Sequence, residues 1–351
     1  MKKLINKALL YRDWKYSKWF IPVLFLELLW VYIPIFLQRN EYGRIILYDM
    51  MYPDTGRGIV IYVFFTLTVM ASVMFTFDRS TISCSFAASM PFTKKEIIAS
   101  KWFVGFYNIF VACISVYVIE NVILILDHNW AENFVLITLS SVSNMLYLLF
   151  ILGFILMLQS INGTVFVGGL ISLVFAAVPG TLIYLIRNVY SRYNEIFLMP
   201  SFIKNTSDFV WKFIVLLMDF LGLDTISDIS TSDFLYSSGM IDLQKYMSYW
   251  TPIKIIIYLA AVVLMFIVSV KLFCKSKFEL NGRITTVVGC NRLYKAIMAF
   301  YAGFLIHAVY LLVAGRIAFR PDIVIVSCVI IPVPFYFIMG KIIKIYNKRF
   351  S

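Results

Sequence analysis

Two carboxylates lie inside long apolar runs of this sequence, where an ionisable side chain is unfavourable. Glu27 falls near the middle of the run 19–37, and Glu120 falls in the second half of the run 102–126. Placing a charge at the centre of a bilayer costs at least about 2.5–3.5 kcal/mol, so such residues often line a cavity or bind a cation. Both are candidates for a substrate pathway that takes a cationic or amphipathic molecule. A hydrogen-bonded structural carboxyl is the alternative for each, and it is favoured for Glu120, which is nearer the interface.

Other residues that carry chemistry are scarce. The two histidines, His128 and His307, have no other histidine, cysteine or acid around them at metal-ligand spacing. A G-x-x-x-x-G-K-[ST] phosphate loop is absent from the sequence. We therefore expect no catalytic residue, no metal site and no cofactor site in this chain.

The composition indicates the element that must position these side chains, namely the membrane-spanning helix. Hydrophobic residues make up 61% of the 351 residues, charged residues only 14%, and the mean hydropathy is +0.86. A bilayer core of about 30 Å needs roughly 20 apolar residues per helical span. The runs are continuously apolar rather than alternating, which favours helices over a barrel. An all-α membrane protein with about eight transmembrane helices is predicted, at 19–37, 59–77, 102–126, 134–158, 163–185, 253–274, 296–314 and 323–343.

Charge distribution predicts the orientation of these spans. Most lysines and arginines fall in segments 1–18, 78–101, 271–295 and 341–351, which places both termini in the cytoplasm. The net charge of +12 then follows from topology and attraction to anionic lipid, and no nucleic-acid partner is expected. None of the five cysteines falls in an outer loop, so free thiols are predicted.

The same map divides the chain into segments. Residues 1–18 are predicted to form a cytoplasmic amphipathic segment, and 19–185 to hold helices 1–5 with an elbow at 78–101. Residues 186–252 are predicted to form an extracellular insert, with a short interfacial helix at 207–223. Residues 253–351 supply helices 6–8 and a basic cytoplasmic tail.

The elbow holds the most distinctive charged stretch, SMPFTKKEIIASKW at residues 89–102. Pro91 ends or interrupts the helix predicted at 80–90. Thr93 and Glu96 form a T-x-x-E capping box, which predicts that a new helix starts at Thr93 and continues into the third span. Lysines anchoring a span to the lipid surface are the simplest explanation of the charges alone.

The string P-F-T-K-K-E-I-I-A-S-K, residues 91–101, resembles the segment that follows the second span in permeases of the ABC-2 transporter family. In that pattern a proline, an apolar residue, Ser or Thr, and a base precede an acid, two apolar residues, a small residue and a final base. Residues 9–19 look like the membrane-surface helix that opens many of these permeases. Residues 275–303 resemble a later cytoplasmic hairpin in Gram-positive permeases linked to cell-envelope antibiotics.

The resemblance implies that the chain is the membrane-spanning permease subunit of an ATP-binding cassette transporter in a bacterial cell membrane. It would export or extract an amphipathic substrate such as a peptide antibiotic or lipid-linked compound, and would itself not be an enzyme. A separate ATPase subunit would bind ATP and Mg, and a second permease copy or a sister permease would complete the transporter. The residues implied in ATPase coupling are Ser89, Pro91, Thr93, Lys94, Lys95, Glu96 and Lys101. The alternative is an ATP-independent carrier or channel that uses Glu27 and Glu120.

Overall fold

Helices make up the described part of this computed structural model, and no strand of a sheet occurs among those residues. The structure describes residues 6–37, 59–79, 92–126, 130–166, 168–169, 171–172, 243–276, 292, 294–303, 306, 326 and 330–348. Its helices are α1 (Lys7–Ser17), α2 (Phe20–Leu37), α4 (Ile59–Arg79), α6 (Lys94–Leu126), α7 (Trp130–Ile161), α11 (Leu243–Lys275) and α14 (Pro332–Lys348).

The short helix α1 buries one face against the bundle and leaves the other exposed. The side chain of Asn6 caps it by accepting a hydrogen bond from the backbone N–H of Ala8 at 3.0 Å. Leu9, Asp13 and Ser17 recur every four residues and are buried against the bundle. The opposite face of α1 is therefore left for solvent or lipid.

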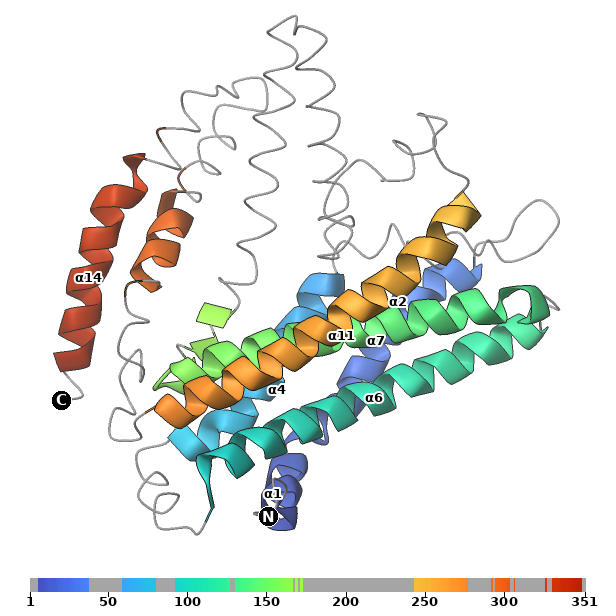
Figure 1. The fold of residues 1–351 in the computed structure, drawn as a ribbon, viewed down its shortest axis with the longest axis horizontal. Helices are drawn as coiled ribbons and strands as arrows, with labels where there is room; N and C mark the ends of the chain where they lie inside the picture. The colour runs from blue at the N-terminus through green and yellow to red at the C-terminus, as the bar shows by residue number, and fades with distance from the viewer. Residues whose placement is uncertain are drawn as a thin grey trace, which may run out of the picture. The chain divides into compact units, whose positions relative to one another are not determined.

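The long helices of the first part of the chain form a bundle. In Figure 1, α6, α7 and α11 run alongside one another, and each of the three contacts the other two. Helix α2 packs on α6 and α4, α4 packs mainly on α7, and α1 packs on α6 and α4. Apolar side chains such as Leu67, Phe75, Ile98, Leu152 and Phe273 fill the space between these helices.

Three described helical segments are long and apolar enough to cross a membrane: Lys94–Leu126, Ile137–Ile161 and Ile255–Lys275. A fourth apolar helix, Phe20–Trp30, is shorter. Exposed apolar side chains follow the length of α6, including Phe106, Phe110 and Ile114, as expected for a helix that faces lipid. The protein is thus a helical membrane protein.

The predicted spans agree with the described helices to different degrees. α2 and α4 cover the predicted runs 19–37 and 59–77, whereas α6, α7 and α11 extend beyond theirs. α14 begins at Pro332. Proline has no backbone N–H, but the first residue of a helix does not need one, because no earlier carbonyl of the helix is there to accept it. Most of 163–185, the insert 186–252 before residue 243, and most of 296–331 lie outside the described residues. The count of eight spans and the helix at 207–223 therefore stay predictions.

By packing, the chain divides into two compact units. One comprises Met1–Ile161 with Asp224–Ser276, and the other comprises Asn162–Leu223 with Lys277–Ser351. In the second unit the Tyr294 hydroxyl donates a hydrogen bond to Asn162, and the Lys295 ammonium lies 5.9 Å from the centre of the Tyr336 ring. The first unit contains the elbow and both candidate carboxylates.

A glycine allows α7 to approach Trp102 of α6 closely. A Cβ on Gly153 would lie 2.5 Å from Trp102 Cη2 and 3.3 Å from Met265 Cβ. The indole cannot easily move, because its Nε1–H donates to Ser269 Oγ at 2.8 Å and its ring meets Phe266 edge-on. Three helices therefore meet at this glycine.

Alanine at this position should destabilise the bundle. We expect Gly153→Ala to lower the free energy of unfolding by about 1–3 kcal/mol through overpacking. Gly105→Ala is the matched control: its Cβ would lie 2.5 Å from Leu152 Cδ2, a terminal methyl that can move by a change of rotamer, whereas the Trp102 ring is held by a hydrogen bond. Unfolding of both variants in the same detergent should show Gly153→Ala as clearly less stable. Equal stabilities would contradict the rigid packing around Trp102.

Candidate functional site: the charged elbow

The capping box predicted from the sequence is present at the start of α6. The backbone N–H of Thr93 donates to Glu96 Oε2 at 2.7 Å, and the N–H of Glu96 donates to Thr93 Oγ1 at 3.3 Å. The Thr93 hydroxyl also donates to the same carboxylate oxygen at 2.9 Å. These bonds give partners to two N–H groups that the start of a helix leaves without an intrahelical acceptor. The prediction of a helix capped by Thr93 is confirmed.

Four charged side chains from three helices meet two turns into α6. We call Arg12, Asp13, Asp78 and Lys101 the ion cluster. The Lys101 ammonium lies 2.6 Å from Asp78 Oδ2 and 3.7 Å from Asp13 Oδ1. Arg12 reaches Asp78 Oδ1 at 3.1 Å and Asp13 Oδ1 at 2.7 Å. The cluster therefore joins α1, the last residues of α4, and α6.

Burial makes the balance of charge in this cluster important. The side chains of Asp13 and Asp78 are each 1% exposed, and that of Lys101 is 0% exposed. Two cations face two anions, so the group as a whole is neutral. Burial alone would lower the pKa of Arg12, but the neighbouring charges of Asp78 and Asp13 and their hydrogen bonds outweigh it and raise the pKa. The Arg12 guanidinium therefore keeps its positive charge beside the two carboxylates.

Uncharged groups complete the coordination of the cluster. Ser100 donates its hydroxyl to Asp13 Oδ2 at 2.6 Å, which gives both oxygens of this carboxylate a partner. Lys101 also donates to the backbone carbonyl of Met74 and lies over the ring of Phe75. Buried ions are tolerated only when such hydrogen bonds accompany the charge pairs.

Two further cationic side chains, Arg79 and Lys94, donate hydrogen bonds to the ends of α7 and α11. Arg79, the last residue of α4, donates to the backbone carbonyl of Ser160 near the end of α7 at 2.9 Å. Lys94, the first residue of α6, donates to the carbonyl of Ser276 just after α11. The charged group of each side chain lies at the C-terminus of a neighbouring helix, where positive charge is favoured. At this end of the bundle, polar contacts thus join α6 to α1, α4 and the end of α11, and α4 to the end of α7.

The residues predicted for ATPase coupling are placed in two groups. Lys95 is exposed, and Thr93, Lys94 and Glu96 are partly exposed, so the first turn of α6 presents polar groups on the surface. Lys101 is fully buried in the ion cluster. A partner that docks on the surface does not touch Lys101, and any part it has in coupling acts through the cluster. Ser89 and Pro91 lie outside the described residues.

The two intramembrane carboxylates are each held by a hydroxyl on another helix. Thr66 of α4 donates to Glu27 Oε1 at 2.6 Å, while the buried Oε2 has no hydrogen-bond partner in the described part of the chain. Ser141 of α7 donates to Glu120 Oε2 at 3.1 Å, and Glu120 is 4% exposed. The Glu27 contact joins α2 to α4, whereas the Glu120 contact joins α6 to α7. The described hydrogen bonds therefore do not connect the two carboxylates in one relay.

Sequence reasoning missed the partners of Lys101. Arg12, Asp13 and Asp78 were not among the predicted site residues, although Asp13 and Asp78 are acids in segments dominated by lysine and arginine. An acid among the bases that flank a span is the signal that could have found them. Among the described residues Cys113 and Cys274 are free, as predicted, and no group of three potential metal ligands occurs there.

Comparison of the chain with protein-family models, with curated proteins and with solved structures gives no match. The resemblance carried by residues 91–101 therefore stays a prediction.

Proposed function

We propose that this chain is the membrane-spanning permease subunit of an ATP-binding cassette transporter. A separate ATPase binds ATP and Mg and docks on the exposed first turn of α6 and the segment before it. Two permease subunits form the pathway for an amphipathic substrate such as a peptide antibiotic or a lipid-linked compound. The proposed setting is a bacterial cell membrane, with both termini in the cytoplasm.

The connection of the first turn of α6 to the other helices is the observation that carries this proposal. Lys95 is exposed at the surface, whereas Lys101 two turns later is locked to α1 and α4 through Asp13 and Asp78. Lys94 links the same turn to the end of α11. A force applied at Lys95 would therefore move several helices together instead of bending one. Such stiffness is what a partner that drives membrane helices requires.

Association with an ATPase tests this proposal. The chain is purified gently from its native membrane, and co-purifying proteins are identified for the wild type, Lys95→Glu and Lys341→Glu. Lys341 is exposed on α14, so Lys341→Glu changes the net charge by the same amount as Lys95→Glu and leaves α6 unchanged. We expect an ATPase with the wild type and with Lys341→Glu, and about tenfold less with Lys95→Glu, which corresponds to a loss of about 1.4 kcal/mol.

Two results would count against the proposal in different ways. If no ATPase accompanies the wild type, the permease function is wrong. If the ATPase is retained equally by all three proteins, the permease function stands and the docking surface lies elsewhere.

The unpartnered oxygen of Glu27 favours a second candidate, an ATP-independent carrier. A carboxyl group with one oxygen bonded to Thr66 and the other without a described partner is suited to exchange a proton or bind a cation. This candidate predicts that transport in ATPase-free vesicles is abolished by Glu27→Gln and persists in Glu120→Gln. Absence of any transport by the wild type in such vesicles would rule it out.

A further inference from the structure

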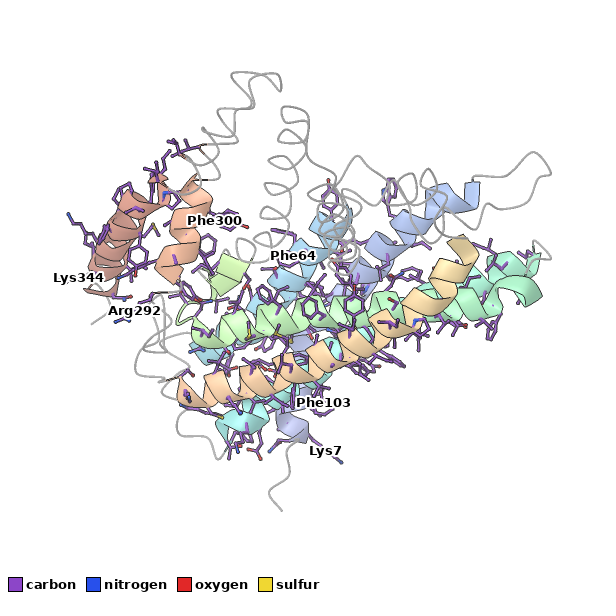
Figure 2. All side chains as sticks on the ribbon, turned by 45° about the horizontal axis from the view of Figure 1, so that its top comes forward. Lys7, Phe64, Phe103, Arg292, Phe300 and Lys344 are labelled. Atoms are coloured by element: carbon purple, nitrogen blue, oxygen red, sulfur yellow. The ribbon has the colours of Figure 1, made fainter. Side chains whose placement is uncertain are left out.

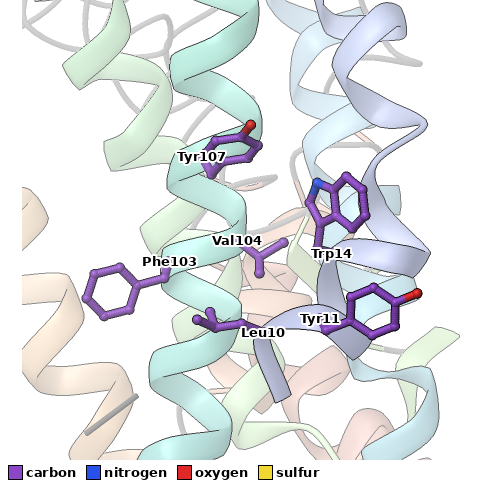
Figure 3. Close-up of a pocket in the computed structure, with 6 residues that line it drawn as sticks. All are labelled: Leu10, Tyr11, Trp14, Phe103, Val104 and Tyr107. Atoms are coloured by element: carbon purple, nitrogen blue, oxygen red, sulfur yellow. The ribbon is translucent and has the colours of Figure 1, made fainter. Parts of the chain in front are cut away.

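An apolar groove lies between α1 and α6 on the outside of the bundle. Its volume is ≈ 400 Å³, within the range of about 300–1,000 Å³ typical of small-molecule sites. Figure 3 shows the side chains that line it, three from each helix: Leu10, Tyr11, Trp14, Phe103, Val104 and Tyr107. Four of the six lining side chains carry neither a charge nor a hydroxyl, and the other two are tyrosines. The groove therefore suits a hydrocarbon chain.

The groove is open rather than covered by the protein. Tyr11, Phe103 and Tyr107 are 63%, 44% and 50% exposed. One wall belongs to α6, which is long and apolar enough to span a membrane, so the groove opens toward lipid. Tyrosine and tryptophan side chains are enriched where a bilayer meets water, because they combine an apolar ring with a polar group. The lining thus matches the interfacial depth of a bilayer.

Lysines surround the α1 side of the groove. Lys7, Tyr11, Trp14 and Lys18 are spaced by four, three and four residues, which places them along one face of the helix. The Lys18 ammonium lies 5.6 Å from the centre of the Trp14 ring and 5.5 Å from that of Trp19. Lys15, beside Trp14, is exposed. Figure 2 labels Lys7 on α1 and Phe103 on α6, the two helices that form the groove.

We propose that this groove binds one anionic phospholipid of the surrounding bilayer. Its phosphate pairs with Lys18 and Lys15, and an acyl chain lies on Trp14, Leu10 and Phe103. Charge complementarity favours an anionic lipid as the occupant. The Lys18 ammonium lies over the Trp14 indole, so a lipid whose acyl chain packs on Trp14 would have its phosphate beside Lys18. The proposal depends on membrane embedding and not on the ATPase partner.

Native mass spectrometry of the purified chain tests the site. The protein in nonionic detergent is titrated with phosphatidylglycerol or with phosphatidylcholine of the same acyl chains, and retained lipids are counted. A lysine near an anionic lipid surface strengthens binding about fivefold. We expect the wild type to prefer phosphatidylglycerol, and Lys15→Gln/Lys18→Gln to lose about tenfold or more in its affinity while its retention of phosphatidylcholine stays unchanged.

Two variants separate the groove from general charge. Lys341→Gln/Lys344→Gln removes the same charge from two exposed lysines of α14 and should keep the preference. Leu10→Trp fills the groove and should reduce retention of both lipids. Equal retention of phosphatidylglycerol by the wild type, Lys15→Gln/Lys18→Gln and Leu10→Trp would overturn the proposal, as would equal losses in the two lysine variants. A shift from dimer to monomer in Leu10→Trp with unchanged lipid would show that a second copy of the chain occupies the groove instead.

Discussion

Replacing Lys101 with methionine should lower the free energy of unfolding by about 3–5 kcal/mol, the usual result of removing one partner from a buried ion pair. Methionine fills similar volume, so the effect comes from charge. Without Lys101, Arg12 is the one cation that the described residues place beside Asp13 and Asp78, so the buried cluster loses its balance of charge. Thermal unfolding in a mild detergent measures the change. Lys95→Met is the matched control on the same helix, and because Lys95 is exposed it should change stability by no more than about 0.5 kcal/mol.

Removing Asp78 together with Lys101 should be far less harmful than removing Lys101 alone. Asp78→Leu leaves Arg12 and Lys101 facing only Asp13, which is one positive charge in excess. The double variant Asp78→Leu/Lys101→Met leaves Arg12 and Asp13, which are neutral together and are 2.7 Å apart. Apolar replacement of a complete buried pair is often neutral or stabilising.

A double-mutant cycle measures this coupling. Residues in one salt-bridge network have interaction energies of about 0.5–3 kcal/mol, and the buried Lys101–Asp78 pair at 2.6 Å should fall at the upper end. Additive losses in the two single variants and the double variant would show that the two side chains do not interact in the folded protein.

Local features of the fold could be predicted from the sequence because they depend on neighbouring residues. The capping box needs only Thr93 and Glu96, three residues apart, and its hydrogen bonds are present. The apolar runs that became α2, α4, α6, α7 and α11 are also local, since the length of a span is set by the thickness of the bilayer. Helix ends were less predictable, and α7 and α11 extend beyond their apolar runs into polar residues.

The ion cluster could not be predicted in the same way. Asp13 and Lys101 are far apart in the sequence, and they meet only because α1 packs on α6 with Ser100 next to Asp13. The charge of a lysine beside a membrane span can be accommodated in two ways, by a partner at the membrane surface or by a buried acidic side chain. The sequence pattern favours the surface for Lys94, Lys95 and Lys101 alike. Their separation into an exposed Lys95 and a buried Lys101 depends on which face of α6 the neighbouring helices cover.

This separation changes how the elbow would work as a coupling device. In the proposed transporter, the partner would contact the first turn of α6 and the segment before it, and the ion cluster would transmit the movement to α1 and α4. The two roles can be tested independently, because Lys95 can be changed without disturbing Asp13 or Asp78.

Photocrosslinking at position 95 shows which molecule contacts the first turn of α6. A photoreactive amino acid replaces Lys95 in the native membrane, and a second protein carries it at the exposed Lys344 of α14 as a control. Proteins joined to the chain are then identified. We expect a nucleotide-binding ATPase to be crosslinked from position 95 and not from position 344. If light at position 95 captures lipid alone, or a protein without a nucleotide-binding domain, the first turn of α6 is a membrane anchor and the coupling account is contradicted.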